Sequence, residues 1–317
     1  MRFRSLLAAA FAAIATGASA QYPDKPITFV VPFAAGSATD QLARAIGQEV
    51  TAQTKQPVVI DNKAGASGFI GAQQVAKAAP DGYTVFITTN TTHAANEHLF
   101  KSIPYDPVKD FAPVTGLAKG GQILLVAPAV QAKSVQELVA FAKANPGKVS
   151  FGSGSSSSRI AGELFQQMAG VELLHVPYKS KPQAISDLLG GQISMMITDV
   201  ATGLPQVKGG KLRALGVSSL NRISLVPDVP TISEAGLKGY EMSFWFAAYV
   251  PAKTPPAVVQ RLQTLLVNAV KGPATKSLFE STGLEPFTTT PDELAKFQQA
   301  ESQKWARIIK AAGIQPE

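Results

Sequence analysis

Short apolar runs of strand length alternate along the chain with segments whose apolar residues recur every three or four positions. ITFVVPF (27–33) is such a run, and Leu42, Ile46 and Val50 fall on one face of the segment that follows it. Pairs of the same kind occur at 57–62 with 71–79 and at 83–89 with 92–100. This order predicts βαβα units, and therefore an α/β protein whose parallel sheet has helices on both faces.

A second series of the same kind begins near residue 134. Ser134 and Glu137 have the spacing of a capping box and predict a helix start. Strands are predicted at 148–152, 173–178, 193–199 and 212–218, with helices over 159–170 and 183–189. A second capping box, Thr290 with Glu293, predicts the start of a long helix near the end of the chain. Two series in about 300 residues predict two lobes, each with its own core.

One internal similarity suggests where the chain passes between the lobes. ILLVAPA (123–129) and FAAYVPA (246–252) are apolar runs with the same Pro-Ala ending. We interpret them as two strands that lie side by side at the crossing. The first lobe is then 21–125 plus 245–317, and the second lobe is 126–244. The alternative, two ordinary core strands, stays open.

The first 20 residues have the pattern of a secretory signal peptide. Arg2 and Arg4 are followed by an apolar stretch over 6–14 and by the small residues Ala18, Ser19 and Ala20. We expect cleavage after Ala20; an uncleaved anchor is the alternative, although the apolar stretch is shorter than a membrane span. The chain has no Cys, so we expect neither disulfides nor a lipidated cysteine.

The positive charge does not indicate a nucleic-acid partner. The formal charge is +7, and loss of Arg2 and Arg4 leaves +5. Lys and Arg are scattered singly and have no aromatic residues between them, unlike a nucleic-acid surface. The charge is compatible with a small anionic ligand.

Two loops of very small residues each join a predicted strand to a predicted helix. At such a junction the first helical amides lack acceptors, and the helix dipole favours an anion. Small residues let a ligand approach these amides closely, and hydroxyl groups add donors. Caps and tight turns without a ligand are the alternative. The candidate ligand-binding residues are Ala35, Gly36, Ser37, Ala38 and Thr39 in the first loop, and Ser153, Gly154, Ser155, Ser156, Ser157 and Ser158 in the second.

Other polar residues near these loops have capping roles or face the space between the lobes. We expect Asp40 to cap the first helix and to pair with Arg44, without a catalytic role. Asn90 and His93 follow the strand over 83–89 and are candidates to face the ligand from the first lobe. Asp199 ends an apolar strand, where it either caps the next turn or holds the far end of a ligand. We interpret His175 as a core or edge residue.

Sequence signatures of enzymes and metal sites are missing. There is no G-x-x-x-x-G-K-[ST], no G-x-S-x-G and no H-E-x-x-H, and His93 and His98 do not have the helical spacing of zinc ligands. A serine hydrolase that uses the 153–158 serines is the enzymatic alternative, but no histidine lies near them in sequence. We therefore predict no catalytic residue, no metal and no cofactor.

The mature chain resembles the Bug proteins, the periplasmic solute receptors of tripartite tricarboxylate transporters. The segments that carry the resemblance include VPFAAGSATDQLAR, AAPDGYT, HVPYKSKPQAISDLLGGQI and PDVPTISEAGLKGYE. The resemblance implies a type II periplasmic binding fold, with two lobes, a two-strand hinge and a cleft that closes on a ligand. It also implies that the two loops grip a ligand carboxylate and that Asp199 helps to select its far end. We therefore expect a periplasmic protein that acts as a monomer and delivers its ligand to the membrane subunits of a transporter.

This chain departs from the family pattern at the predicted ligand site. The first loop is poorer in Gly and Pro than usual, Arg159 stands where relatives often have His, and Ser180 replaces a usual Gly. Arg159 is a candidate clamp for a second carboxylate, with a surface position as the alternative. Phe33 and Trp245 are candidates to flank an aromatic acid such as terephthalate, unless both are core residues. The predicted ligand is a small organic carboxylate, most simply a dicarboxylate; a sensory receptor for the same ligand is the alternative.

Overall fold

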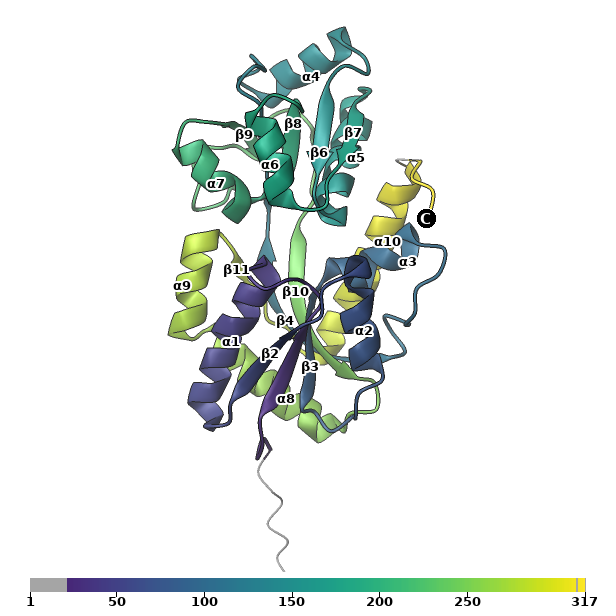
Figure 1. Ribbon diagram of the computed structural model, residues 1–317, viewed down its shortest axis with the longest axis vertical. Helices are drawn as coiled ribbons and strands as arrows, with labels where there is room; N and C mark the ends of the chain where they lie inside the picture. The colour runs from purple at the N-terminus through teal and green to yellow at the C-terminus, as the bar shows by residue number, and fades with distance from the viewer. Residues whose placement is uncertain (1–21, 312, 317) are drawn as a thin grey trace, which may run out of the picture.

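Two β-sheets, each flanked by helices, are stacked along the long axis of the molecule (Figure 1). The computed structural model describes residues 22–311 and 313–316. The predicted signal peptide, residues 1–20, lies outside the described residues. No helix of the described part is both long enough and apolar enough to cross a membrane.

The first sheet has six strands in the order β11-β4-β10-β3-β1-β2. Their bounds are β1 (Ile27–Val31), β2 (Val58–Asn62), β3 (Thr84–Thr89), β4 (Phe111–Gly120), β10 (Phe244–Pro251) and β11 (Glu285–Pro286). β1 pairs in parallel with β2 and β3, whereas β10 runs antiparallel to β3 and β4. The parallel sheet predicted from the βαβα order is therefore only half of a mixed sheet.

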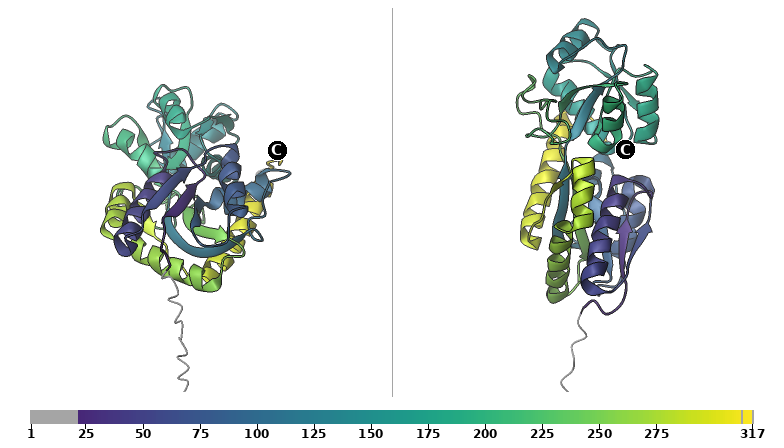
Figure 2. Two further views of the ribbon diagram at one scale, coloured as in Figure 1. Left: turned by 60° about the horizontal axis from the view of Figure 1, so that its bottom comes forward. Right: turned by 90° about the vertical axis from the view of Figure 1, so that its left-hand side faces the viewer.

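Helices cover both faces of this sheet (Figure 2). They are α1 (Ala38–Thr54), α2 (Phe69–Ala76), α3 (Asn96–Leu99), α8 (Pro256–Val270), α9 (Pro273–Thr282) and α10 (Pro291–Ala311), with a 3₁₀ turn η1 (Ala66–Gly68) and a π-helical turn η2 (Thr91–Ala95). β1 has core on both sides. Phe29 packs with Leu42 of α1, and the neighbouring Val30 packs in a separate cluster with Phe86. This two-sided burial explains why the strand is an unbroken apolar run rather than an alternating one.

The second sheet has five strands in the order β7-β6-β8-β5-β9. Their bounds are β5 (Gln122–Val126), β6 (Ser150–Ser153), β7 (Leu174–Pro177), β8 (Met195–Asp199) and β9 (Arg213–Val217). The helices around it are α4 (Val135–Ala144), α5 (Ser156–Ala169), α6 (Lys181–Leu189) and α7 (Val200–Lys208). β6 lies between β7 and β8 and runs parallel to both, so all three strands end at the same edge of the sheet.

The chain crosses between the sheets at two adjacent places. β4 ends at Gly120, and on the return β10 begins at Phe244, directly opposite Gly120 in the ladder. Ser218 joins the two crossing segments. Its backbone N–H donates to the carbonyl oxygen of Gln122 at 2.8 Å, and its hydroxyl donates to the carbonyl oxygen of Met242 at 2.6 Å. The predicted two-lobe architecture is confirmed.

The two similar apolar runs do not lie side by side, and that prediction is wrong. Residues 123–129 begin in β5 of the second sheet, whereas residues 246–252 lie mainly in β10 of the first sheet. The strands next to β10 are β3 and β4. Because β5 belongs entirely to the second sheet, we propose that the first lobe ends at Gly121 and not at residue 125.

Both predicted helix starts are confirmed, but only the second has the two bonds of a capping box, because Glu137 Oε2 accepts from Lys133 N and not from Ser134 N. Glu137 donates its backbone N–H to the Ser134 hydroxyl at 3.1 Å, at the start of α4. At the start of α10 the exchange is reciprocal: Glu293 N donates to Thr290 Oγ1 at 3.2 Å, and Thr290 N donates to Glu293 Oε2 at 2.8 Å. These short-range signals placed the helix starts because they need no information from the rest of the fold.

Candidate functional site

The space between the lobes is bordered by the ends of parallel strands from both sheets. α1 follows β1 and η2 follows β3 in the first lobe; α5, α6 and α7 follow β6, β7 and β8 in the second. Asp199, the last residue of β8, lines a pocket together with Ala38 in the first turn of α1. Since β6 and β7 run parallel to β8 or to its neighbour, the loops that follow them lie at the same edge of the second sheet.

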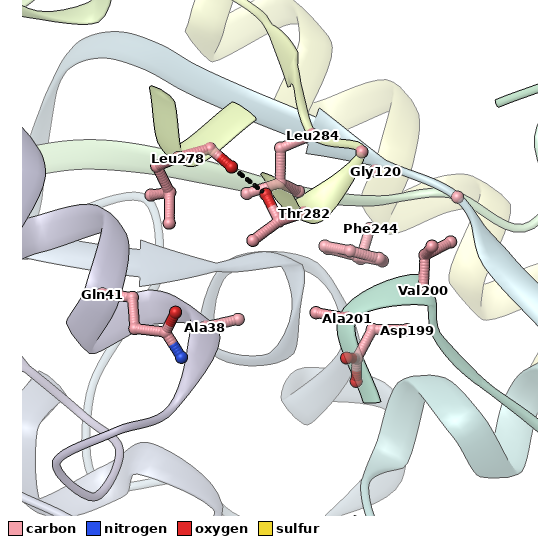
Figure 3. Close-up of a pocket in the computed structure, with 12 residues that line it drawn as sticks. Ala38, Gln41, Gly120, Asp199, Val200, Ala201, Phe244, Leu278, Thr282 and Leu284 are labelled. Carbon is pink, nitrogen blue, oxygen red and sulfur yellow. Dashed lines mark hydrogen bonds between the residues drawn. The ribbon is translucent and has the colours of Figure 1, made fainter. Parts of the chain in front are cut away.

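The cavity volume of this pocket is about 20 Å³, room for roughly one water molecule, so a small organic acid fits between the lobes only if they move apart. Figure 3 shows the Asp199 carboxylate and the start of α7 on one side, with the start of α1 opposite. Phe244 and the end of α9 form the remaining wall (Figure 3). The lining residues are Ala38, Gln41, Gly120, Gly121, Asp199, Val200, Ala201, Phe244, Leu278, Thr282, Gly283 and Leu284.

The first loop is held in place by a buried carboxylate. Asp40 Oδ2 accepts from Gly36 N at 2.8 Å and from Arg44 Nε at 3.0 Å. Asp40 Oδ1 accepts from Asn62 Nδ2 at 3.0 Å, and the same amide group donates to Phe33 O at 3.0 Å. Burial acts to raise the pKa of Asp40, but the bonds from Arg44, Gly36 and Asn62 outweigh it and keep that pKa below its usual value. The predicted pairing with Arg44 is confirmed, but the predicted role of Asp40 as the cap of the helix is wrong, because Ser37 is the N-cap.

Asp40 also limits which amides of this loop can meet a ligand. The Gly36 N–H is bonded to Asp40, and the Ser37 N–H is bonded to Ala34 O at 3.1 Å. Ser37 caps the helix, because its hydroxyl accepts from Asp40 N at 3.2 Å. The first-turn amides of Ala38 and Thr39 have no intrahelical acceptor by helix geometry, and Ala38 lines the pocket. Ala35 and Gly36 are exposed, Ser37 and Ala38 are half-buried, and Thr39 is buried.

The second loop is a capped helix start as well. The Ser155 hydroxyl accepts from Ser158 N at 3.3 Å and contacts the Ser157 hydroxyl at 3.1 Å. Ser158 is buried, and its hydroxyl donates to the carbonyl oxygen of Ile197 on β8. Ser156 and Ser157 are half-buried at the start of α5, where their amides lack intrahelical acceptors. None of the predicted serines lines the pocket described above, so a role for these two amides in ligand binding stays a prediction.

Gly154 is required by close packing within the second lobe. A Cβ at this position would lie 2.3 Å from the backbone N of Lys181 and 2.4 Å from the backbone C of Ser180. The start of α6 therefore packs directly against the second loop. The contact with α6 therefore accounts for the glycine at position 154.

Asp199 caps α7 and is paired with a lysine. Its Oδ1 accepts from Thr202 N at 2.9 Å and from Thr202 Oγ1 at 2.6 Å, and its Oδ2 contacts Lys181 Nζ at 2.5 Å. Burial acts to raise the pKa of Asp199, but Lys181 and Thr202 outweigh it and hold that pKa below its usual value. The carboxylate is therefore charged at neutral pH, and its charge is balanced by Lys181.

His93 and Trp245 are core residues, so the expectation that they contact a ligand is not supported. His93 is 0% exposed, and its ring stacks on Tyr249 with centroids 3.9 Å apart. Burial lowers the pKa of His93 to about 3. Trp245 is 1% exposed, packs on Phe297 and donates its Nε1 to Glu301 Oε2 at 3.1 Å. Asn90 is buried beside His93 at the end of β3.

Arg159 and Phe33 lie near the site without lining the pocket described above. Arg159 is half-buried in the first turn of α5, and its charge acts on Glu163 and His175. Phe33 is half-buried and packs against the core of the first lobe. The aromatic ring that does line the pocket is Phe244.

A histidine does lie beside one of the serines, although not in sequence. The Ser153 hydroxyl and His175 Nε2 are 2.8 Å apart on the neighbouring strands β6 and β7. Burial, with a smaller effect from Arg159, lowers the pKa of His175 to about 4, so its ring is neutral at pH 7. Ser153 is 5% exposed, so its hydroxyl is a poor nucleophile for an incoming ester. The described residues contain no group of three or more potential metal ligands.

Sequence reasoning missed several residues at this site. Lys181 carried no recognisable signal because its partner Asp199 is 18 positions away. The expected pocket aromatic in this strand is Trp245, whereas its neighbour Phe244 is the one that lines the pocket. Gln41 and Gly120 reach the pocket through their positions in the first turn of α1 and at the crossing between lobes.

The chain matches the family described as tripartite tricarboxylate transporter family receptor over residues 42–314. Among solved structures it is similar to Rpa4515 of R. palustris with adipate, at 34% identity and a TM-score of 0.86, covering 93% of this chain and 100% of that chain. It is also similar to MatC of Rhodopseudomonas palustris with bound malate, at 30% identity and a TM-score of 0.80, covering 91% and 100%. The periplasmic binding protein BugD is 32% identical with a TM-score of 0.82, covering 93% and 100%.

These comparisons agree with the architecture seen here. The fold is the two-lobed type II periplasmic binding fold. The matched family and these neighbours are solute-binding proteins and not enzymes, which confirms the prediction of a binding protein.

Proposed function

The chain belongs to the tripartite tricarboxylate transporter receptor family, and we propose that it captures a small dicarboxylate between its lobes for delivery to the membrane subunits of such a transporter. We place this capture in the periplasm, with the receptor acting as a monomer. The ligand is an unbranched or aromatic dicarboxylate.

The observation that supports this proposal most strongly is the pocket lined by the starts of α1 and α7, one from each lobe. Helix starts offer unpaired N–H groups and a favourable dipole for an anion. The negative side chains nearby, Asp40 and Asp199, are already paired with Arg44 and Lys181. The charges of these two carboxylates are therefore balanced, which lowers their repulsion of a carboxylate ligand.

The available donors are sufficient for useful affinity. A charge-assisted hydrogen bond contributes about 1.5–3 kcal/mol, and micromolar binding needs about 8 kcal/mol in total. Five such donors, the amides of Ala38, Thr39, Ser156, Ser157 and Val200, would supply about 8–15 kcal/mol before the costs of immobilisation, so micromolar binding needs the upper part of this range.

The two lobes are in contact with one another on both sides of the pocket. α7 contacts α9 on one side of the pocket, and α5 contacts η2 and α10 on the other. A ligand that bridges the lobes would favour the closed arrangement by its contacts with both. We propose that the closed arrangement is the one that the transporter recognises.

Ligand identity is tested by thermal unfolding with a panel of acids. The panel contains succinate, malate, glutarate, adipate, terephthalate, citrate and glutamate. A ligand that binds only the folded protein raises the melting temperature as its concentration rises. We expect such a rise for at least one dicarboxylate, and native mass spectrometry of that complex should show one ligand per chain. Failure of every acid to raise the melting temperature would contradict the proposal.

A further inference from the structure

We propose that Lys181 sets the class of ligand by binding its second carboxylate; this inference rests on the proposed function. Lys181 is the first residue of α6, and its side chain is 28% exposed. Its ammonium group contacts Asp199, a residue that lines the pocket between the lobes. The cation therefore lies at the edge of the same space as the helix starts.

The position of Lys181 is fixed by its surroundings. The backbone at Ser180 and Lys181 packs on Gly154, so α6 begins in contact with the second loop. Asp199 holds the ammonium group from the start of α7. The lysine thus spans two of the three helix starts at this edge of the second sheet, within a framework that keeps its charge in place.

The hydrogen bonding of this pair leaves donors unused on the lysine. Asp199 Oδ1 already accepts two bonds from Thr202, and Oδ2 accepts one from Lys181. An ammonium group has three N–H donors, and Asp199 uses one of them. The remaining N–H groups are directed away from Asp199, so an acceptor on a ligand can bind them while the ion pair stays intact.

One carboxylate of the ligand would use the helix-start amides, and the second would use Lys181. A monocarboxylate of the same length would place a methyl group or a ring carbon beside the cation and would gain nothing from it. If Lys181 has this role, the protein should select its ligands by the number of their carboxylates and not by their chain length alone.

The test compares each diacid with its matched monoacid by isothermal titration calorimetry. The pairs are succinate with butyrate, glutarate with valerate, adipate with hexanoate, and terephthalate with benzoate. For the best-bound diacid, we expect the wild-type protein to bind the diacid at least tenfold more tightly than its monoacid. Lys179→Met is the control, because Lys179 is exposed and its loss changes the net charge equally. This control should keep both affinities within about twofold of wild type.

Lys181→Met alone leaves Asp199 with an unbalanced charge, so it should weaken the binding of both the diacid and the monoacid. The double variant Lys181→Met with Asp199→Asn removes that charge and keeps a residue suited to cap α7. In the double variant we expect the monoacid affinity to return to within about threefold of wild type. The diacid should stay at least tenfold weaker than in wild type, and thermal unfolding checks that the variant is folded.

If the affinity for the diacid recovers together with that for the monoacid in the double variant, the inference is overturned, because Lys181 would then only neutralise Asp199. Equal wild-type affinity for a diacid and its monoacid would also overturn it, although carboxylate capture would stand. Binding of neither acid by the wild-type protein would instead contradict the proposed function itself.

Discussion

Gly154→Ala tests whether the second loop and the start of α6 form one rigid part of the site. The new Cβ would lie 2.3 Å from Lys181 N, 2.4 Å from Ser180 C and 2.6 Å from Ser180 O. These are backbone atoms, so no side-chain rotation can relieve the overlap. An ordinary contact needs roughly 1 Å more separation, and α6 must move away from the loop to provide it.

Overpacking of this kind typically costs about 1–3 kcal/mol, so we expect Gly154→Ala to lower the free energy of unfolding by about 2 kcal/mol in urea denaturation. The shift also moves Lys181 relative to Ser156 and Ser157. We therefore expect the affinity for the best diacid to fall at least tenfold, measured by calorimetry under conditions in which the variant is folded.

Gly190→Ala is the matched control in the same lobe. Its Cβ would meet the nearest atom at 3.5 Å, an ordinary contact, and its φ of −75° suits any residue. Its unfolding free energy should stay within about 0.5 kcal/mol of wild type, or rise slightly. The reasoning is refuted if Gly154→Ala matches wild type in both stability and affinity, or if both variants are equally damaging.

Two further predictions concern the first lobe. Asp40→Asn removes the charged acceptor of Gly36 N and Arg44 Nε, so we expect about 2 kcal/mol lower stability in urea and at least tenfold weaker diacid binding; unchanged affinity would show that Asp40 does not organise the loop. Burial lowers the pKa of His93 in the folded chain to about 3, so below about pH 6.5 the unfolded chain binds a proton that the folded chain does not. The free energy of unfolding therefore falls as the pH decreases from about 6.5 to about 3. His93→Phe keeps a ring against Tyr249 and should remove about 1–2 kcal/mol of the stability loss between pH 6.5 and 5, measured by urea denaturation at each pH. The same pH dependence in wild type and variant would place the titration elsewhere.

Much of the fold could be predicted because its signals are local. The helix starts at Ser134 and Thr290 are specified by caps within three residues, whereas α1 is capped by Ser37 and not by Asp40 as expected. The apolar runs gave the strands because β1 and β8 are buried throughout or nearly so. The pairing of strands was harder to predict. The first sheet is mixed because β10 returns from the second lobe beside β3 and β4, and no local pattern reports that return.

The residues of the site were harder still to predict, because their roles depend on contacts with residues far away in the sequence. Phe244 and Trp245 are adjacent in β10, so their side chains point to opposite faces, and only the fold decides which face meets the pocket. His93 was expected at the cleft because it follows a strand. The π-helical turn η2 instead turns its ring onto Tyr249, which is far away in the sequence. Lys181 acquires its role through Asp199 and Gly154, which come from two other strand ends.

We propose that helix starts from both lobes bind one carboxylate of the ligand at once. The decisive experiment is a crystal structure of the complex with the best-bound diacid. We expect one carboxylate within about 3 Å of the amides of Ala38 or Thr39 and of at least one amide among Ser156, Ser157 and Val200. A ligand that contacts only one lobe, or that lies outside the space between α1 and α7, would contradict it.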